Sequence, residues 1–158
     1  MAIATKLKEM LEARGLDHQV IRHEPVYTAQ EEAAASHVPG REWAKTVVLF
    51  ADGKPALAVL PATRRVDEEA FRKVAGAEEV RLAEEEEFPA LYEDCEPGAM
   101  PPFGFLYGQT TFVDESLRQA ERIAFHAGDH ETAVEMSYAD WEAVAEPVPG
   151  TFSERPAP

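Results

Sequence analysis

Lys45 is the residue whose position most needs a chemical explanation, because it stands directly before an apolar run. Residues 46–50 read TVVLF, a pattern typical of a strand buried on both faces. Either the lysine stem covers the sheet while its ammonium group stays in water, or the ammonium is a fixed cation aimed at a carbonyl or phosphate oxygen. The small neighbours Ala44 and Thr46 leave space around the ammonium, which favours the fixed cation.

A second candidate is the segment CEPGAMPPFG, residues 95–104. Gly98 allows a backbone N–H group to approach a ligand closely. Pro101 and Pro102 make the segment stiff, because proline fixes φ and lacks an N–H donor. The alternative is a plain structural crossover between two elements, which is the more common role of segments rich in proline and glycine.

Other catalytic chemistries find little support in the sequence. Cys95 lies in an acidic segment, which raises the pKa of a thiol, so we interpret it as a packing residue. His126 and His130 have the spacing of two metal ligands on a helix, but Gly128 and Asp129 between them indicate a turn. Serine-hydrolase, phosphate-loop and dinucleotide signatures are absent. We expect no metal and no cofactor, and keep a metal-dependent hydrolase using the two histidines as a minor alternative.

The composition limits the class of protein and the kind of partner. A chain of 158 residues with a single cysteine fits one domain without an intrachain disulfide. The net charge of −15 argues against a broad groove for nucleic acid. Residues 41–81 alone are net positive, with eight basic and seven acidic residues, so a local basic face is compatible with the sequence. The apolar runs are strand-sized and no signal peptide is present, so we expect a cytoplasmic protein without membrane or DNA partners.

The candidate residues lie among alternating helices and strands. The pattern predicts one domain of the α/β (α+β) class over residues 1–146, a mixed sheet with helices, followed by a proline-rich frayed tail at 147–158. Capping signals open three of the helices: Thr28 with Glu31, Asp67, and Ser137 with Asp140. We expect helices over 3–14, 29–37, 68–75, 84–92 and 138–145, and strands over 18–23, 46–50, 56–61, 79–83, 110–113, 121–127 and 132–137.

An ordered series of motifs closely resembles the YbaK family, the freestanding relatives of the editing (insertion) domain of bacterial prolyl-tRNA synthetase. The resemblance covers about His18 to Trp141, and the series reads TAQEEAA, AKTVVL, LAVLPATRRVD, VRLA, PGAMPPFG, FVDESL and IAFHAG. The resemblance implies a mixed, partly barrel-like β-sheet flanked by helices. It also implies an aminoacyl-tRNA deacylase, which hydrolyses the ester of mischarged tRNA in trans.

The resemblance places the family's functional positions on this chain. The family's essential lysine falls on Lys45, and its G-x-x-x-P loop falls on residues 98–102. The resemblance therefore implies Lys45 and Gly98 as catalytic residues. Cysteine-specific members tend to carry a serine before the loop proline, where this chain has Met100, so it looks closer to the alanyl and seryl branches. The implied substrate-binding residues are Tyr27, Thr28, Thr46, Ala99, Met100, Pro101, Pro102 and His130.

A mechanism follows as an expectation from this resemblance. The CCA end of the aminoacyl-tRNA enters between the strand of Lys45 and the loop, and the Gly98 amide, with Ala99, stabilises the oxyanion of the ester carbonyl. Lys45 holds a phosphate or the carbonyl, while the ribose 2′-hydroxyl helps to activate water. We expect a small amino acid such as Ala, Ser or Cys, and an aminoacyl-tRNA synthetase as a second partner. The main alternative is a non-catalytic module of the same fold that binds aminoacyl-tRNA or a synthetase.

Overall fold

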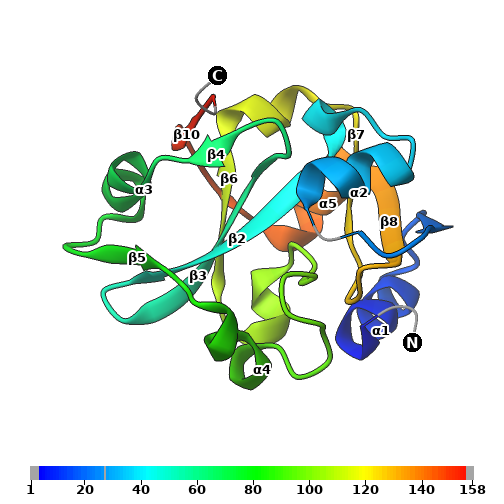
Figure 1. Ribbon diagram of the computed structural model, residues 1–158, viewed down its shortest axis with the longest axis horizontal. Helices are drawn as coiled ribbons and strands as arrows, with labels where there is room; N and C mark the ends of the chain where they lie inside the picture. Colours follow the sequence, from blue (N-terminus) through cyan, green and yellow to red (C-terminus); the bar gives the residue numbers. More distant parts are fainter. Residues whose placement is uncertain (1–3, 27, 156–158) are drawn as a thin grey trace.

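A mixed five-stranded sheet forms the centre of the molecule in the computed structural model, which describes residues 4–26 and 28–155 (Figure 1). Its strand order is β5-β2-β3-β6-β9. The β2–β3 hairpin and the β2–β5 pair are antiparallel, whereas β3–β6 and β6–β9 are parallel. The five strands are β5 (Val80–Leu82), β2 (Ala44–Ala51), β3 (Lys54–Pro61), β6 (Thr110–Asp114) and β9 (Val148–Gly150).

A smaller antiparallel sheet stands beside the first, in the order β1-β8-β7. Its strands are β1 (Gln19–Arg22), β8 (Thr132–Ser137) and β7 (Arg122–His126). A single parallel bridge between Trp43 and Ala124 connects it to the start of β2. The sheets therefore meet at the end of β2 that carries Lys45, and they do not close into a barrel.

Helices cover both faces of this β framework, and local signals explain where they begin and end. Thr28 and Glu31 form the predicted capping box, and the Asp67 and Ser137 side chains accept hydrogen bonds from the Ala70 and Asp140 N–H groups. The α-helices are α1 (Thr5–Arg14), α2 (Ala29–Ala35), α3 (Glu68–Ala75), α4 (Phe88–Leu91) and α5 (Tyr138–Ala145). The 3₁₀ turns are η1 (Gly40–Glu42), η2 (Glu85–Glu87), η3 (Gly104–Tyr107) and η4 (Glu115–Gln119). None of the helices in these described ranges combines the length and the apolar character needed to cross a membrane.

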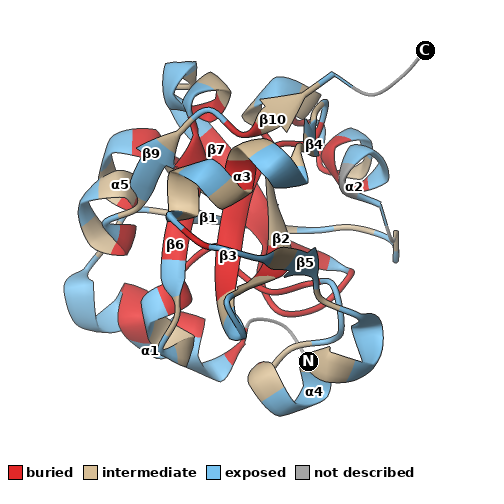
Figure 2. Cartoon of the chain, turned by 90° about the vertical axis from the view of Figure 1, so that its left-hand side faces the viewer, coloured by how far each residue is buried: buried red, intermediate tan, exposed pale blue. Residues whose placement is uncertain are grey.

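Residues 56–61 of β3 and Val48 and Leu49 of β2 are buried at the centre of the sheet, whereas Val47 and Phe50 are half-buried and the edge strands β5 and β9 are more exposed (Figure 2). Alternation along β2 decides which side chain faces which layer. Leu49 packs with Phe71 of α3, whereas Val48 packs with Met100 and with Tyr92, which follows α4. Odd-numbered residues of β2 therefore face α3, and even-numbered residues face the loop that contains Met100.

The expectation of a frayed tail after residue 146 is wrong for residues 148–154. β9 extends the central sheet at its edge, a place that tolerates Pro149 because an edge strand can leave one N–H position unused. β10 (Ser153–Glu154) pairs with β4 (Arg65–Val66). Phe152, which lies in the chain between β9 and β10, is buried against Phe71. The C-terminal segment is thus part of the folded core.

Candidate active site

The loop of residues 95–104 is held in one conformation by its own backbone and by a neighbouring turn. Gly98 has φ of 86°, a conformation that favours glycine. The Ala99 N–H donates to the Glu96 carbonyl oxygen at 3.0 Å, and the Ala99 carbonyl accepts from the Gly128 N–H at 2.9 Å. Within the described residues the Gly98 N–H has no hydrogen-bond partner, so it is available to a ligand. The Ala99 N–H is already used, which corrects the expectation that both amides donate to substrate.

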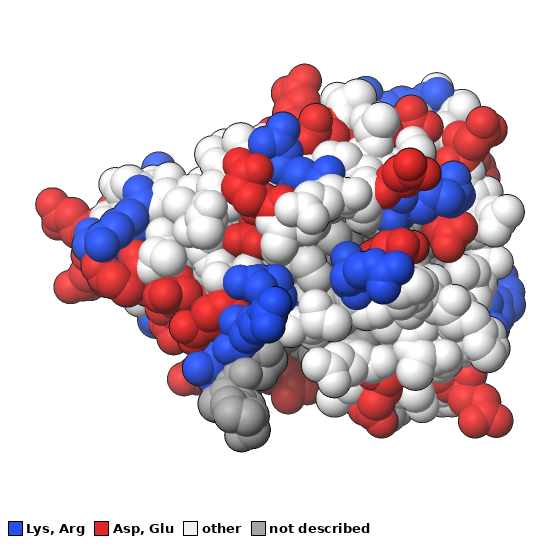
Figure 3. Space-filling model, turned by 90° about the horizontal axis from the view of Figure 1, so that it is seen from above, with Lys and Arg blue, Asp and Glu red and all other residues white. Residues whose placement is uncertain are grey.

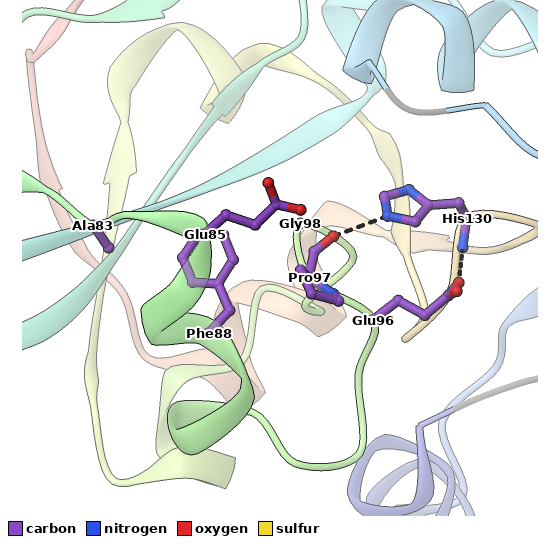
Figure 4. A pocket seen from close by; sticks show the side chains of 7 residues that line it. All are labelled: Ala83, Glu85, Phe88, Glu96, Pro97, Gly98 and His130. Carbon is purple, nitrogen blue, oxygen red and sulfur yellow. Dashed lines mark hydrogen bonds between the residues drawn. The ribbon is translucent and has the colours of Figure 1, made fainter.

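His130 lies against this loop and connects it to the turn after β7 (Figure 4). The His130 backbone N–H donates to a Glu96 carboxylate oxygen at 2.9 Å. Its ring Nε2 lies 2.9 Å from the Pro97 carbonyl oxygen, so that nitrogen carries the proton and donates. A Cβ built on Gly98 would lie 3.7 Å from the His130 ring. The turn and the loop therefore form one rigid unit.

The two segments border an open hollow of about 630 Å³. In Figure 4 the Glu85 side chain extends across this hollow towards Gly98, and His130 closes the opposite side. Two carboxylates, Glu85 and Glu96, make the hollow electronegative, so it suits a cationic group such as an ammonium better than a phosphate. Its lining consists of Ala83, Glu85, Phe88, Glu96, Pro97, Gly98 and His130.

Lys45 lines a second hollow, of about 510 Å³, on the α3 side of the sheet. Its ammonium Nζ donates to the Arg64 carbonyl oxygen at 2.5 Å, and burial lowers the pKa of Lys45 below its ordinary value. The Arg64 guanidinium in turn donates to Ser153 of the C-terminal segment. The hollow is lined by Lys45, Val47, Arg65, Val66, Asp67, Glu68, Leu82 and Glu154.

Lys45 and Gly98 therefore do not face one cavity, and the expectation that substrate enters directly between them is wrong. Lys45 is an odd-numbered residue of β2 and faces α3, while the loop packs on the even-numbered face. The two hollows are still neighbours, because Leu82 lines one and the next residue, Ala83, lines the other. They flank the end of β5 from opposite sides.

The remaining predicted substrate-binding residues occupy different environments. Thr46 lies on the loop side of β2, and its hydroxyl oxygen is buried without a hydrogen-bond partner among the described residues. Met100, Pro101 and Pro102 form the buried part of the loop, where the Pro102 carbonyl accepts from the Trp141 indole N–H at 2.9 Å. They anchor the loop in the core and do not line the hollow. Thr28 is exposed at the start of α2, and Tyr27 lies outside the described residues.

Basic and acidic groups are interspersed on the face shown in Figure 3, and the described part of the chain presents no uninterrupted basic stripe there. The basic residues of segment 41–81 include several arginines. Three of these arginines have carboxylate partners within 3.0 Å: Arg65 with Glu154, Arg72 with Glu69, and Arg81 with Glu87. A partner of high negative charge would have to compete with these pairs.

Comparison with known proteins decides the family. Residues 23–144 match the model of the aminoacyl-tRNA editing domain. The chain belongs to this family. The editing domain is 26% identical, over 158 residues, to the prolyl-tRNA editing protein ProX of Acetoanaerobium sticklandii, covering 96% of this chain and 93% of that protein. It is 29% identical, over 150 residues, to the multifunctional Ser/Thr-tRNA deacylase ProXp-y of Escherichia coli strain K12, covering 90% of this chain and 87% of that protein.

Solved structures share the fold of this editing domain. The crystal structure of the hypothetical protein APE2540 superposes with a TM-score of 0.84 at 25% identity, covering 94% of this chain and 99% of the other. A candidate trans-editing enzyme for prolyl tRNA synthetase superposes with a TM-score of 0.83 at 21% identity, covering 96% of both chains. The single mixed α/β domain inferred from the sequence is therefore confirmed.

Five residues that line the hollow of the editing domain were not among the predicted site residues: Ala83, Glu85, Phe88, Glu96 and Pro97. The run of glutamates at 84–87 was a visible signal, but a run of like charges is usually a solvated surface. Here the Glu84–Glu87 capping box and the Arg81–Glu87 ion pair fix the turn that presents Glu85.

Cys95 and the histidine pair have the surroundings of structural residues. Burial raises the pKa of the Cys95 thiol to about 12, and the Asp94 carboxylate contributes in the same direction. The His126 and His130 rings pack edge to face, with centroids 5.4 Å apart. Among residues 4–26 and 28–155, no three His, Cys, Asp or Glu side chains are arranged to hold a metal ion.

Proposed function

We propose that this editing domain hydrolyses the ester bond between a small amino acid, such as Ala, Ser or Cys, and the 3′ end of tRNA, acting in trans. The observation that carries the proposal is the available Gly98 N–H, fixed at positive φ on the rim of a hollow with two carboxylates. An ester of an amino acid presents a carbonyl oxygen and an α-ammonium group. The amide suits the first and the carboxylates suit the second.

Each part of the site then has a role. The Gly98 N–H donates to the carbonyl oxygen as negative charge develops there, and a donor of this kind contributes about 3 kcal/mol to transition-state stabilisation. Glu85 and Glu96 orient the ammonium. Lys45, in the adjoining hollow, binds a phosphate of the CCA end, whose neighbouring hydroxyl assists the attacking water. Positioning and electrostatics supply the rate.

The acidic body of the editing domain makes the interaction with tRNA weak and salt-sensitive. Binding through the CCA end limits the contact to the two hollows, where Lys45 and Arg65 supply positive charge beside the carboxylates of Asp67, Glu68 and Glu154. The proposal carries a cytoplasmic location with it, because charged tRNA is a cytoplasmic molecule. A synthetase as second partner fits a domain whose own surface holds tRNA weakly.

Deacylation of Ala-, Ser-, Cys-, Thr- and Pro-tRNA by purified protein tests the proposal. Gly98→Ala should lower kcat at least tenfold, because Cβ at φ of 86° displaces the amide. Gly53→Ala is the matched control, because Gly53 also has a positive φ, of 81°, and a Cβ added there would meet no atom within 4 Å. Gly53 lies in the turn between β2 and β3 and does not line the hollow. Equal effects of the two changes, or wild type that spares every ester, would refute the proposal.

A non-catalytic module that binds an aminoacyl end is the second candidate. The separation of Lys45 from Gly98 favours it, since the two predicted catalytic residues line different hollows. Such a module would bind aminoacyl-tRNA without hydrolysing it, so Lys45→Ala would change the affinity and no enzymatic rate would be lost. The same panel separates the two functions.

A further inference from the structure

A group of buried titratable side chains lies behind His130, outside the hollow. Glu32 of α2 is completely buried, and its ion-pair partners among the described residues are two histidines and neither lysine nor arginine. One carboxylate oxygen contacts His23 Nε2, and the other lies 3.7 Å from His126 Nδ1. Asp129, also buried, faces Glu32 from the turn after β7, and His130 packs on the His126 ring.

Counting protons restricts the charge of this group. His23 Nδ1 lies 2.7 Å from the Glu24 carbonyl oxygen, which can only accept, so Nδ1 carries a proton. The contact between His23 Nε2 and Glu32 then holds one further proton. That proton lies either on the carboxyl group, which donates to a neutral ring, or on the ring of an imidazolium that faces a carboxylate.

The surroundings favour the neutral arrangement. Burial, together with the Asp129 charge, raises the pKa of Glu32 to about 8. Burial, the neighbouring His130 and His23 lower the pKa of His126 to about 3, so His126 is neutral and cannot compensate a carboxylate. At neutral pH Glu32 is therefore a carboxylic acid in contact with His23 Nε2.

This contact joins two segments that lie behind the hollow and pack against its His130 turn. His23 belongs to the segment before α2, which pairs with the turn through His23 N–H to Glu131 carbonyl at 2.9 Å and Val26 N–H to His130 carbonyl at 3.2 Å. Glu32 connects α2 to that segment, and through His126 it supports the ring of His130.

We infer that Glu32 is a positioning residue of the editing site, whose protonated carboxyl group contacts His23, packs beside His126 and so holds the His130 turn against the Gly98 loop. The inference rests on the proposed function for its effect on rate. In this role the Glu32 side chain makes no contact with substrate. The active form of the protein carries Glu32 as the neutral carboxylic acid.

Replacement of Glu32 tests this role, because glutamine reproduces a neutral donor and aspartate does not reach as far. Glu32→Gln should keep kcat within twofold of wild type at pH 7, whereas Glu32→Asp and Glu32→Ala should lower it at least tenfold. Above pH 8 the background-corrected kcat of wild type should fall by about tenfold per pH unit as Glu32 ionises, and Glu32→Gln should lose this decline. Glu12→Gln, an exposed change on α1, should behave as wild type.

A second readout needs no activity and separates this inference from the proposed function. The ratio of the unfolding equilibrium constants of wild type and Glu32→Gln should rise by about tenfold per pH unit towards pH 8 and then level off, since only wild type releases the proton. A ratio independent of pH, a Glu32→Gln protein that does not fold, or Gln as damaging as Ala would overturn the inference. If no aminoacyl-tRNA is hydrolysed, the proposed function fails and this ratio alone decides the role of Glu32.

Discussion

Asp114→Asn should destabilise the editing domain and loosen the segment that supports Lys45. The Asp114 carboxylate is buried at the end of β6 and accepts five hydrogen bonds. Phe152 N–H donates to Oδ1 at 2.8 Å and Ser153 N–H at 3.0 Å, while Oδ2 accepts from Ser116 and from the Ser153 hydroxyl. One carboxylate thus holds the C-terminal segment to the central sheet.

The magnitude follows from what an asparagine cannot do. If the amide oxygen replaces Oδ1, the bonds from Phe152 and Ser153 lose their charge, and the Ser116 N–H faces an amide NH₂ instead of an acceptor. Loss of charge weakens each of the two bonds by about 1 kcal/mol, and an unsatisfied N–H costs about 1–3 kcal/mol. We expect the free energy of unfolding to fall by about 3–5 kcal/mol.

The pH dependence gives the same prediction a second check. Burial raises the pKa of Asp114, but the hydrogen bonds from Ser116, Phe152 and Ser153 outweigh it and hold the pKa below its usual value of 3.8. A depressed carboxyl pKa stabilises the fold above pH 3.8, and this contribution is lost as pH falls through the folded pKa. Asp114→Asn should therefore remove part of the acid sensitivity of wild type.

Urea unfolding at pH 7 and pH 3 measures both effects. Asp67→Asn is the matched control, because asparagine caps a helix as well as aspartate does. A loss below 1 kcal/mol for Asp114→Asn, or an equal loss for the control, would refute this account of the C-terminal segment. Deacylation should also decline, since Ser153 holds Arg64 and the Arg64 carbonyl holds Lys45.

Three further predictions concern other parts of the fold. Gly128→Ala should lower the free energy of unfolding by at least about 2 kcal/mol, because the added Cβ, at φ of 117°, would lie 2.8 Å from Ala4 at the start of α1. Gly15→Ala is the control and should lower it by about 1 kcal/mol, because a Cβ added there would meet no atom within 4 Å. The lowered pKa of His126 stabilises the fold above pH 6.5, and wild type should lose about 2 kcal/mol of this stability between pH 6.5 and pH 5, a loss that His126→Gln should remove. The raised pKa of Glu32 has the opposite effect, a loss of stability as the pH rises towards 8, which Glu32→Gln should remove. Urea unfolding of the variants over pH 4–9 measures both effects. Cys95→Ala should leave deacylation unchanged, and wild type should resist iodoacetamide at pH 8, because the thiol pKa is about 12.

The framework of the fold was accessible from the sequence because its signals are local. The Thr28 capping box, the Asp67 cap and the turn between β2 and β3 depend on residues a few positions apart. The C-terminal segment was missed because its prolines suggest fraying, while its order comes from Asp114, a residue about forty positions earlier.

The site was only partly accessible, for reasons of strand geometry. A strand that is apolar on both faces does not reveal which face each residue takes, so the pattern could not place Lys45 on the side away from Gly98. Similarly, Glu31 and Glu32 are adjacent and alike in sequence, yet the first caps α2 in water and the second is buried. Rotation around the helix makes this distinction, and it depends on the tertiary contacts of α2.

The pairing of β1 with β8 has a consequence for how the protein is made. Residues 19–22 remain without their partner until residues 132–135 have left the ribosome, and residues 65–66 wait for 153–154. Such distant pairings slow folding and leave early segments exposed during translation. A chain that stops before residue 130 therefore has neither a finished sheet nor a completed hollow, because His130 lines that hollow and β8 follows it.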